Sequence, residues 1–257
     1  MRINPATVTY HDVIRVVHGK PEPVLSRFNT GYATLLNLYR RYGRKLLDLF
    51  PKTLYYFQTT GARRDAGLEL MERKLDLLTE LGYLAPGGLT AKGQFASYLY
   101  GYELLMTELY IKHHLDDLDP PALAVLLSAA VYEPRPGMAM PRRTALAKRL
   151  EGLCEEPLER IHRAEQRYGI SPRSKAPHFQ LAGAMEAWFH GTPFAGLTKL
   201  SDVDEGEIVR YFRMTVQLLR QLMDAPAADP AMRRKAQIAF TKVNRDVVDA
   251  EQQLRLG

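Results

Sequence analysis

Cysteine is nearly absent from this sequence, since Cys154 is the only one among its 257 residues. A single thiol cannot form a disulfide within the chain, and it cannot supply a cysteine-rich zinc site. Disulfide-stabilised domains and cysteine-based zinc modules are therefore excluded as classes. A reducing compartment, most simply the cytoplasm, is expected for a chain that carries one free thiol.

Long hydrophobic runs are also missing. The longest apolar run is Pro120–Tyr132, which has 13 residues, whereas a membrane-spanning helix needs roughly 20. The first residues, Met1–Pro5, lack the charged and then apolar pattern of a signal peptide. We expect the apolar run to form a buried helix, and we expect no membrane partner.

The common motifs of catalysis and cofactor binding are absent. The sequence contains no Gly-x-x-x-x-Gly-Lys-Ser/Thr loop for phosphates, no Gly-x-Gly-x-x-Gly fingerprint and no Gly-x-Ser-x-Gly elbow. His113 and His114 are adjacent, and neighbouring side chains on a helix point about 100° apart, so the two do not share a ligand face. We expect no catalytic or metal-binding residues, no cofactor and no small-molecule substrate on this chain.

The charge that is present has a basic surplus. The formal net charge is +6 and the isoelectric point is about 9.3. Lysine and arginine exceed aspartate and glutamate in residues 1–61 and 126–175, whereas residues 62–125 are acidic. A basic surplus favours a polyanionic partner such as a nucleic acid, although an ordinary solvated surface also accounts for it.

Helical periodicity dominates the chain, which predicts a mainly α fold. Five apolar residues of the segment 64–81 recur at spacings of three and four and so share one helix face, and Gly82 follows as a helix end. Residues 83–90 are extended around a Pro-Gly-Gly turn. Three helices followed by a small hairpin predict a winged helix over residues 26–98, and residues 99–257 an all-helical bundle. The helices predicted after the hairpin span residues 95–114, 120–132, 142–168, 182–190, 204–223 and 232–254.

Several segments, in this order, resemble superkiller-type DExH RNA helicases and their bacterial HelY-like relatives. They are Ser26–Tyr32, Leu81–Leu84, Leu126–Glu133, Trp188–Phe194 and Glu205–Arg210. The resemblance implies the winged helix and DSHCT-type helical bundle that follow the motor of such a helicase. Residues 1–25 would then be the exit from a RecA-like motor domain. ATP and magnesium would bind in those motor domains, which would be protein partners of this chain. The family's arch insertion has no room at Thr59–Ala62.

The resemblance also points to the residues that would bind a threaded strand. In the segment Glu207–Met223 a polar stripe repeats at i, i+3, i+7 and i+10, formed by Arg210, Arg213, Gln217 and Arg220. Aligned arginines can meet successive phosphates of single-stranded RNA or DNA. Arg210 falls on the arginine of a family motif, and the match suggests that Glu133 also faces the strand. Trp188 is either a core anchor or a platform for base stacking.

Two other functions remain open from the sequence. The chain could be a protein-interaction scaffold that binds no nucleic acid, with its polar stripe a solvated face. It could also be a stand-alone winged-helix DNA-binding regulator, but the third helix is acidic and would repel phosphates. The acidic residues of that helix are Asp65, Glu69, Glu72, Asp76 and Glu80. The sequence does not decide between RNA and DNA, the direction of travel or the oligomeric state.

Overall fold

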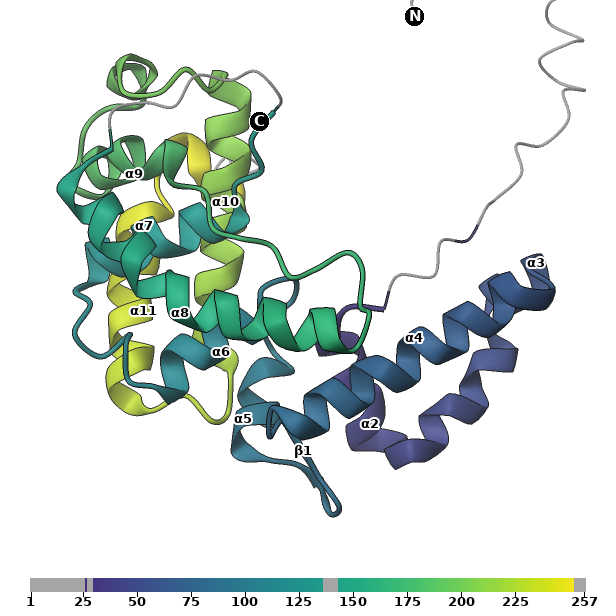
Figure 1. The fold of residues 1–257 in the computed structure, drawn as a ribbon. Coiled ribbons are helices and arrows are strands. Elements are labelled where there is room, and N and C mark those ends of the chain that lie inside the picture. Colours follow the sequence, from purple (N-terminus) through teal and green to yellow (C-terminus); the bar gives the residue numbers. More distant parts are fainter. Residues whose placement is uncertain (1–25, 27–29, 136–142, 252–257) are drawn as a thin grey trace, which may run out of the picture.

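The structure, a computed structural model, describes residue 26 and residues 30–135 and 143–251. The segment 1–25 therefore lies outside the described residues. Helices make up most of the described chain, which confirms the predicted mainly α class (Figure 1). The elements are α2 (Tyr32–Tyr42), the 3-10 helix η2 (Gly43–Lys52), α3 (Leu54–Gln58), α4 (Gly61–Glu80), β1 (Leu84–Ala85), β2 (Gly88–Leu89), α5 (Ala91–Ala96), α6 (Glu103–Ile111), α7 (Pro120–Val131), α8 (Ala145–Arg167), η3 (Phe179–Leu181), α9 (Ala182–Phe189), η4 (Phe194–Lys199), α10 (Glu205–Asp224), α11 (Pro230–Val243) and η5 (Asp246–Val248).

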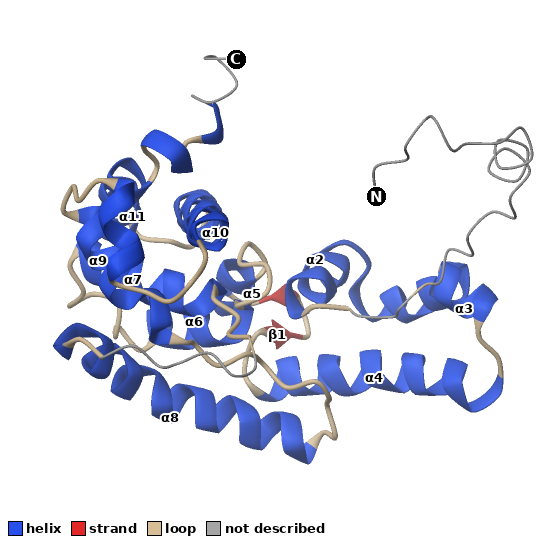
Figure 2. Cartoon of the chain, turned by 90° about the horizontal axis from the view of Figure 1, so that it is seen from above, coloured by secondary structure: helices blue, strands red, loops and turns tan. Residues whose placement is uncertain are grey.

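Helices α2, α3 and α4 extend to one side of the bundle and lead into the hairpin of β1 and β2 (Figure 2). Helix α4 ends where the sequence predicts, because Gly82 takes a left-handed conformation with φ of 76°. The N–H of Tyr83 then donates to the carbonyl of Leu78 at 2.8 Å. Each strand has only two residues, paired antiparallel. The order of elements is that of the predicted winged helix, whose assignment remains a prediction.

Helix α7 forms the centre of the bundle and packs against α8, α9, α10 and α11 (Figure 1). Its residues from Ala122 to Val131 are all buried, as expected for a helix that is apolar on every side. The side chain of Asp119 accepts a hydrogen bond from the N–H of Ala122 at 3.0 Å, and Pro120 occupies the first turn. An aspartate followed by a proline also starts α11, where the side chain of Asp229 accepts a hydrogen bond from the N–H of Met232 at 2.8 Å.

Two of the predicted helices differ from the structure. The predicted helix 95–114 is divided into α5 and α6 around Gly101, whose φ of 91° is not helical. The predicted helix 232–254 ends already at Val243. Arg245 donates to the carbonyls of Trp188 and Thr192, both at 2.9 Å, and so draws the chain back across α9. These long-range contacts override the local helical periodicity.

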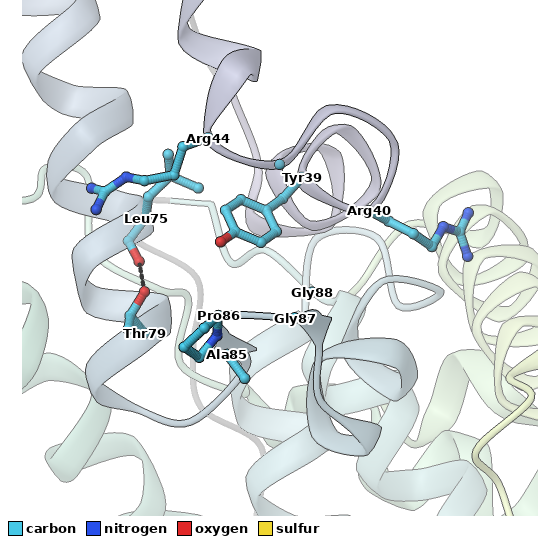
Figure 3. A pocket seen from close by; sticks show the side chains of 10 residues that line it. Tyr39, Arg40, Arg44, Leu75, Thr79, Ala85, Pro86, Gly87 and Gly88 are labelled. Carbon is cyan, nitrogen blue, oxygen red and sulfur yellow. Dashed lines mark hydrogen bonds between the residues drawn. The ribbon is translucent and has the colours of Figure 1, made fainter.

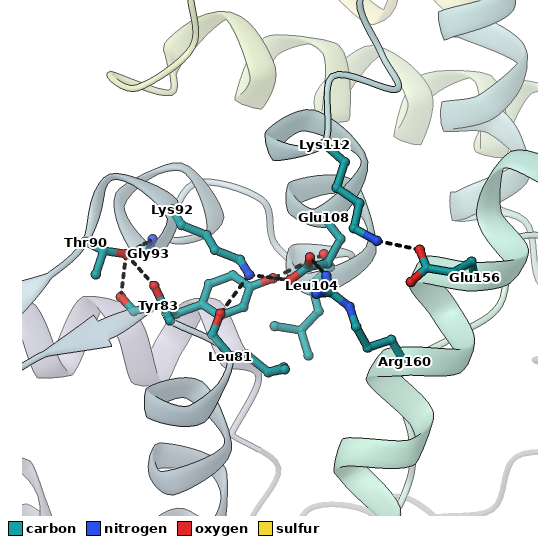
Figure 4. Close-up of polar contacts among 11 residues, drawn as sticks. Leu81, Tyr83, Thr90, Lys92, Gly93, Leu104, Glu108, Lys112, Glu156 and Arg160 are labelled. Carbon is teal, nitrogen blue, oxygen red and sulfur yellow. Dashed lines mark hydrogen bonds and ion pairs between the residues drawn. The ribbon is translucent and has the colours of Figure 1, made fainter.

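A buried polar cluster joins the hairpin to the bundle (Figure 4). Glu108 of α6 has a side chain that is 2% exposed, and it pairs with Lys92 at 2.5 Å and with Arg160 of α8. The hydroxyl of Tyr83 donates to Glu108 at 2.9 Å. Burial, with the charges of Arg160 and Lys112, lowers the pKa of Lys92 to about 8. One carboxylate thus holds three elements in a fixed relation.

A second polar junction fixes the start of α2. Glu103 accepts a hydrogen bond from the N–H of Ala33 at 2.9 Å, and fully buried Glu165 accepts one from the hydroxyl of Tyr32 at 2.8 Å. The ammonium of Lys74 donates to the carbonyl of Thr30 at 2.7 Å. The two bonds to Glu103 and Glu165 cross the predicted boundary between residues 26–98 and 99–257. The apolar core also continues across it, and the division into two domains remains a prediction.

Candidate nucleic-acid interface

Helix α10 is amphipathic, as its sequence predicts. Its apolar stripe is buried against α7 and α11. Acidic residues occupy its first turn, where their negative charge interacts favourably with the helix dipole. Val209 and Met223 continue this stripe and are only half-buried. The buried residues of α10 are Ile208, Tyr211, Phe212, Thr215, Val216, Leu218, Leu219 and Leu222. The packing therefore fixes which face of α10 remains for a ligand.

The predicted polar stripe of α10 lines a groove of about 510 Å³. One wall carries the four predicted residues Arg210, Arg213, Gln217 and Arg220. The facing wall is the segment 244–251, which contributes Asn244, Val248 and Glu251 among others. The structure thus brings the stripe together along a hollow of the surface, where the sequence predicted only a polar helix face.

The members of the stripe have different surroundings. Arg213 donates from Nε to the carbonyl of Val248 at 3.1 Å and from Nη2 to that of Val247 at 2.8 Å, so it holds the facing wall in place. Arg220 lies 3.4 Å from Glu251 and above the ring of Phe240. Gln217 is exposed. Only part of the stripe is therefore accessible from solvent, since Arg213 and Arg220 are already engaged with the segment 244–251.

Arg210 is the most accessible arginine of the groove, with a side chain that is 57% exposed. Its Nη2 donates to the hydroxyl of Tyr211 at 2.6 Å, and that hydroxyl donates in turn to the backbone carbonyl of Glu133 at 3.1 Å. Glu207 lies 3.5 Å from the same guanidinium. The Tyr211 hydroxyl thus links Arg210, at one end of the groove, to the backbone of Glu133, whose side chain does not line the groove.

Glu133 is exposed and lies among cations. Its side chain pairs with Lys175, and this bond together with the charges of Lys175, Arg210 and His178 holds the pKa of the Glu133 carboxyl below its usual value. Arg135 lies nearby and pairs with Glu207 at 3.0 Å. Sequence reasoning missed Lys175 and Arg135, although both belong to the basic segment 126–175.

Trp188 occupies the core and has no exposed surface. Its Nε1–H donates to the carbonyl of Val243 at 2.9 Å, and the guanidinium of Arg245 lies 3.4 Å from the centre of its ring. The ring has no open face on which a base could stack in this conformation. Its surroundings are those of a core anchor, one of the two interpretations of Trp188 that the sequence leaves open.

Metal-ligating side chains do not gather in the part of the chain that the structure describes. Within it, no three or more histidine, cysteine, aspartate or glutamate side chains come together as metal ligands would. None of the helices in those residues combines the length and the apolar character needed to cross a membrane.

The fold and the groove along one amphipathic helix define an all-helical domain with a surface groove, and comparison identifies the family. Residues 87–251 match the family described as the DSHCT (NUC185) domain. The chain belongs to this family. The match includes the bundle, the groove and both Glu133 and Arg210.

Several of the curated relatives are named as RNA helicases. The ATP-dependent RNA helicase mtr4 of Schizosaccharomyces pombe is 25% identical over 255 residues, 93% of this chain and 22% of the relative. Human Superkiller complex protein 2 is 28% identical over 193 residues, 69% of this chain and 15% of the relative. Human Exosome RNA helicase MTR4 is 31% identical over 155 residues, 58% of this chain and 15% of the relative. The resemblance to superkiller-type DExH helicases is confirmed, and the chain spans about a fifth or less of these relatives.

Proposed function

We propose that this chain is the nucleic-acid-binding module of an ATP-dependent RNA helicase and guides a single strand behind the motor. The observation that carries the proposal is the groove of α10, with Arg210 at one end linked through the Tyr211 hydroxyl to the backbone of Glu133. RNA is the proposed substrate because the relatives are named as RNA helicases. The motor domains, with their ATP and magnesium, would be partners of this chain.

The residues of the groove would act by position and charge. Arg210 would meet a phosphate, because its guanidinium offers several donors and is more than half exposed. Glu133 would accept a hydrogen bond from a base or a 2′-hydroxyl, which RNA has and DNA lacks. Gln217 would bond a phosphate or a base further along, and Arg220 would do so after leaving Glu251. Arg213 would keep the groove open by holding residues 247 and 248.

Residues 26–98 would serve as a winged helix that packs between motor and bundle. Its α4 is acidic and unsuited to a DNA groove. The polar junctions at Glu108 and Glu103 support such a packing role, because they tie this part to α6 and α8. The one free thiol, Cys154, is buried and is compatible with a cytoplasmic location.

The test is the affinity of the full chain for a fluorescent oligouridylate. Arg210→Ala should weaken binding by roughly 1.5–3 kcal/mol, the range for a hydrogen bond to a charged group. It should also flatten the dependence of log K on log salt by roughly 0.7, the value for one lost phosphate contact. Arg149→Ala is the matched control, since Arg149 is an exposed arginine of α8 away from the groove.

The alternative is a protein-interaction scaffold. It predicts no measurable RNA affinity, or an affinity that Arg210→Ala and Arg149→Ala reduce equally. Either result, with the fold verified by circular dichroism, would count against strand guiding.

A further inference from the structure

The outer face of α2 carries a second hollowed surface, away from the groove of α10. A cavity of about 530 Å³ lies between α2, α4 and the turn Pro86–Gly88. Two neighbouring cavities, of about 590 and 260 Å³, continue it toward Tyr42 and Tyr98. Arg40 lines all three. In Figure 3 the ring of Tyr39 faces the turn, while Arg40 points away from it.

The second of these cavities combines arginines with exposed aromatic rings. We call its residues Asn37, Arg40, Arg41, Tyr42 and Tyr100 the α2 surface. Tyr100 is 54% exposed and Tyr42 is 39% exposed. Among the described residues, neither Arg40 nor Arg41 pairs with a carboxylate. Arg40 donates a hydrogen bond to Asn37, and Arg41 lies beside the ring of Tyr42. Flat rings next to unneutralised guanidinium groups are the elements with which proteins hold single-stranded nucleic acid.

Hydrogen bonds connect the α2 surface to the end of α10. Gln221 follows Arg220 on α10 and accepts a hydrogen bond from the N–H of Tyr100 at 3.1 Å. The amide of Asn37 donates to the hydroxyl of Tyr100 at 3.3 Å and accepts from Arg40 at 2.9 Å. In Figure 2, α10, α5 and α2 follow one another across the middle of the molecule. The polar stripe of α10 therefore leads at its C-terminal end to the α2 surface.

We propose that the α2 surface is a second binding site for single-stranded RNA, which continues the path of the strand beyond the groove of α10. Arg40 and Arg41 contact phosphates there, and the rings of Tyr100 and Tyr42 stack on bases. Asn37 fixes the position of Arg40 and of the Tyr100 hydroxyl. The continuation of the path rests on the proposed function, whereas RNA binding by the α2 surface itself can be measured separately.

The experiment uses the full chain and a fluorescent oligouridylate of about 16 nucleotides, the upper site size for one single-strand-binding module. The variant Arg40→Ala/Arg41→Ala/Tyr100→Ala should bind at least about tenfold more weakly, as expected from one lost stacked base. Its salt dependence should be flatter by about 1.4, for two lost phosphate contacts. Lys148→Ala/Arg149→Ala removes the same charge from exposed positions of α8 and is the control.

Two further measurements separate stacking from charge and one site from the other. Tyr100→Phe keeps the ring and should retain affinity, whereas Tyr100→Ala should lose it. A probe with 4-thiouridine at one end should cross-link to the peptide that contains Tyr100. The variant Arg210→Ala on the same probe reports on the groove of α10 alone.

The outcomes are distinguishable. Weaker binding in the α2 variant with no effect of Arg210→Ala supports the α2 site and counts against the guiding role of α10. Weaker binding in Arg210→Ala with unchanged binding in the α2 variant overturns the present proposal and leaves the proposed function intact. In that case the α2 surface is a protein contact, for instance with the motor. Equal losses in the α2 variant and in the Lys148→Ala/Arg149→Ala control also overturn it.

Discussion

At the scale of single residues, equal side chains have unequal roles on α10. Arg210 and Arg213 are one helical turn apart, yet Arg210 is exposed beside Glu207 and Tyr211, while Arg213 bonds to two backbone carbonyls. The difference arises from the segment 244–251, which lies over one part of the stripe and not over the other. A side chain of the stripe is accessible only where this segment leaves it open.

Gly93 leaves space for a backbone oxygen. A Cβ atom at this position would lie 2.1 Å from the carbonyl oxygen of Tyr83, which cannot move without disturbing the hairpin. We expect Gly93→Ala to lower the free energy of unfolding by about 1–3 kcal/mol, as for other overpacked sites. Gly152→Ala is the control, because a Cβ atom there, in α8, would meet nothing within 4 Å and alanine favours a helix. Urea denaturation measures both, and equal midpoints would contradict this view of Gly93.

Asp229 gives α11 a pH-dependent contribution. The hydrogen bond from the N–H of Met232 holds the pKa of the Asp229 carboxyl below its usual value. A lowered pKa in the folded state means that the contribution is present above the ordinary aspartate pKa, about 3.9, and is lost as the pH falls below it. Asp229→Asn keeps a capping side chain without this titration. The difference in unfolding free energy between the two proteins should therefore shrink from pH 7 to pH 3, and a constant difference would contradict the assignment.

At the scale of elements, Arg213 connects α10 to the turn formed by η5. Its two hydrogen bonds hold the carbonyls of residues 247 and 248, the last two residues of η5. We expect Arg213→Ala to speed amide exchange at Val248 and Asp249, whose N–H groups bond within this turn. Gln217→Ala, also on the stripe, should leave that exchange unchanged. Exchange measured by NMR decides this, and equal rates in both variants would mean that the turn is held by other contacts.

The sequence predicts elements well where the signal is local. The end of α4 at Gly82 depends on neighbouring residues, and it is confirmed. The start of α11 depends in the same way on Asp229 and Pro230. The end of α11 could not be predicted, because Arg245 is drawn away by carbonyls of residues 188 and 192. The polar stripe of α10 can be predicted from its helical periodicity. The facing wall of the groove cannot, because it is formed by the segment 244–251, which the sequence predicts as part of a continuous helix.

At the scale of the whole molecule, we expect the purified chain to hydrolyse no ATP and to bind RNA equally with and without it. The reason is that the sequence has no phosphate-binding loop, and the chain corresponds to about a fifth or less of its helicase relatives. A phosphate-release assay measures turnover, and the Arg210→Ala protein purified in the same way shows any contaminating activity. Turnover that remains proportional to the chain through several purification steps would contradict the expectation.

The junction at the start of α2 has a mechanical consequence. Thr30, Tyr32 and Ala33 are held by Lys74, Glu165 and Glu103, which belong to three different helices. A force or torque applied to the chain ahead of α2 would act on all three hydrogen bonds together. Because the interior is closely packed, the displacement would be transmitted to α4, α6 and α8 and would not bend a single helix. The first turn of α2 is thus a stiff coupling, and if the proposed motor is attached ahead of it, a push from that motor would move the bundle and its groove as one piece.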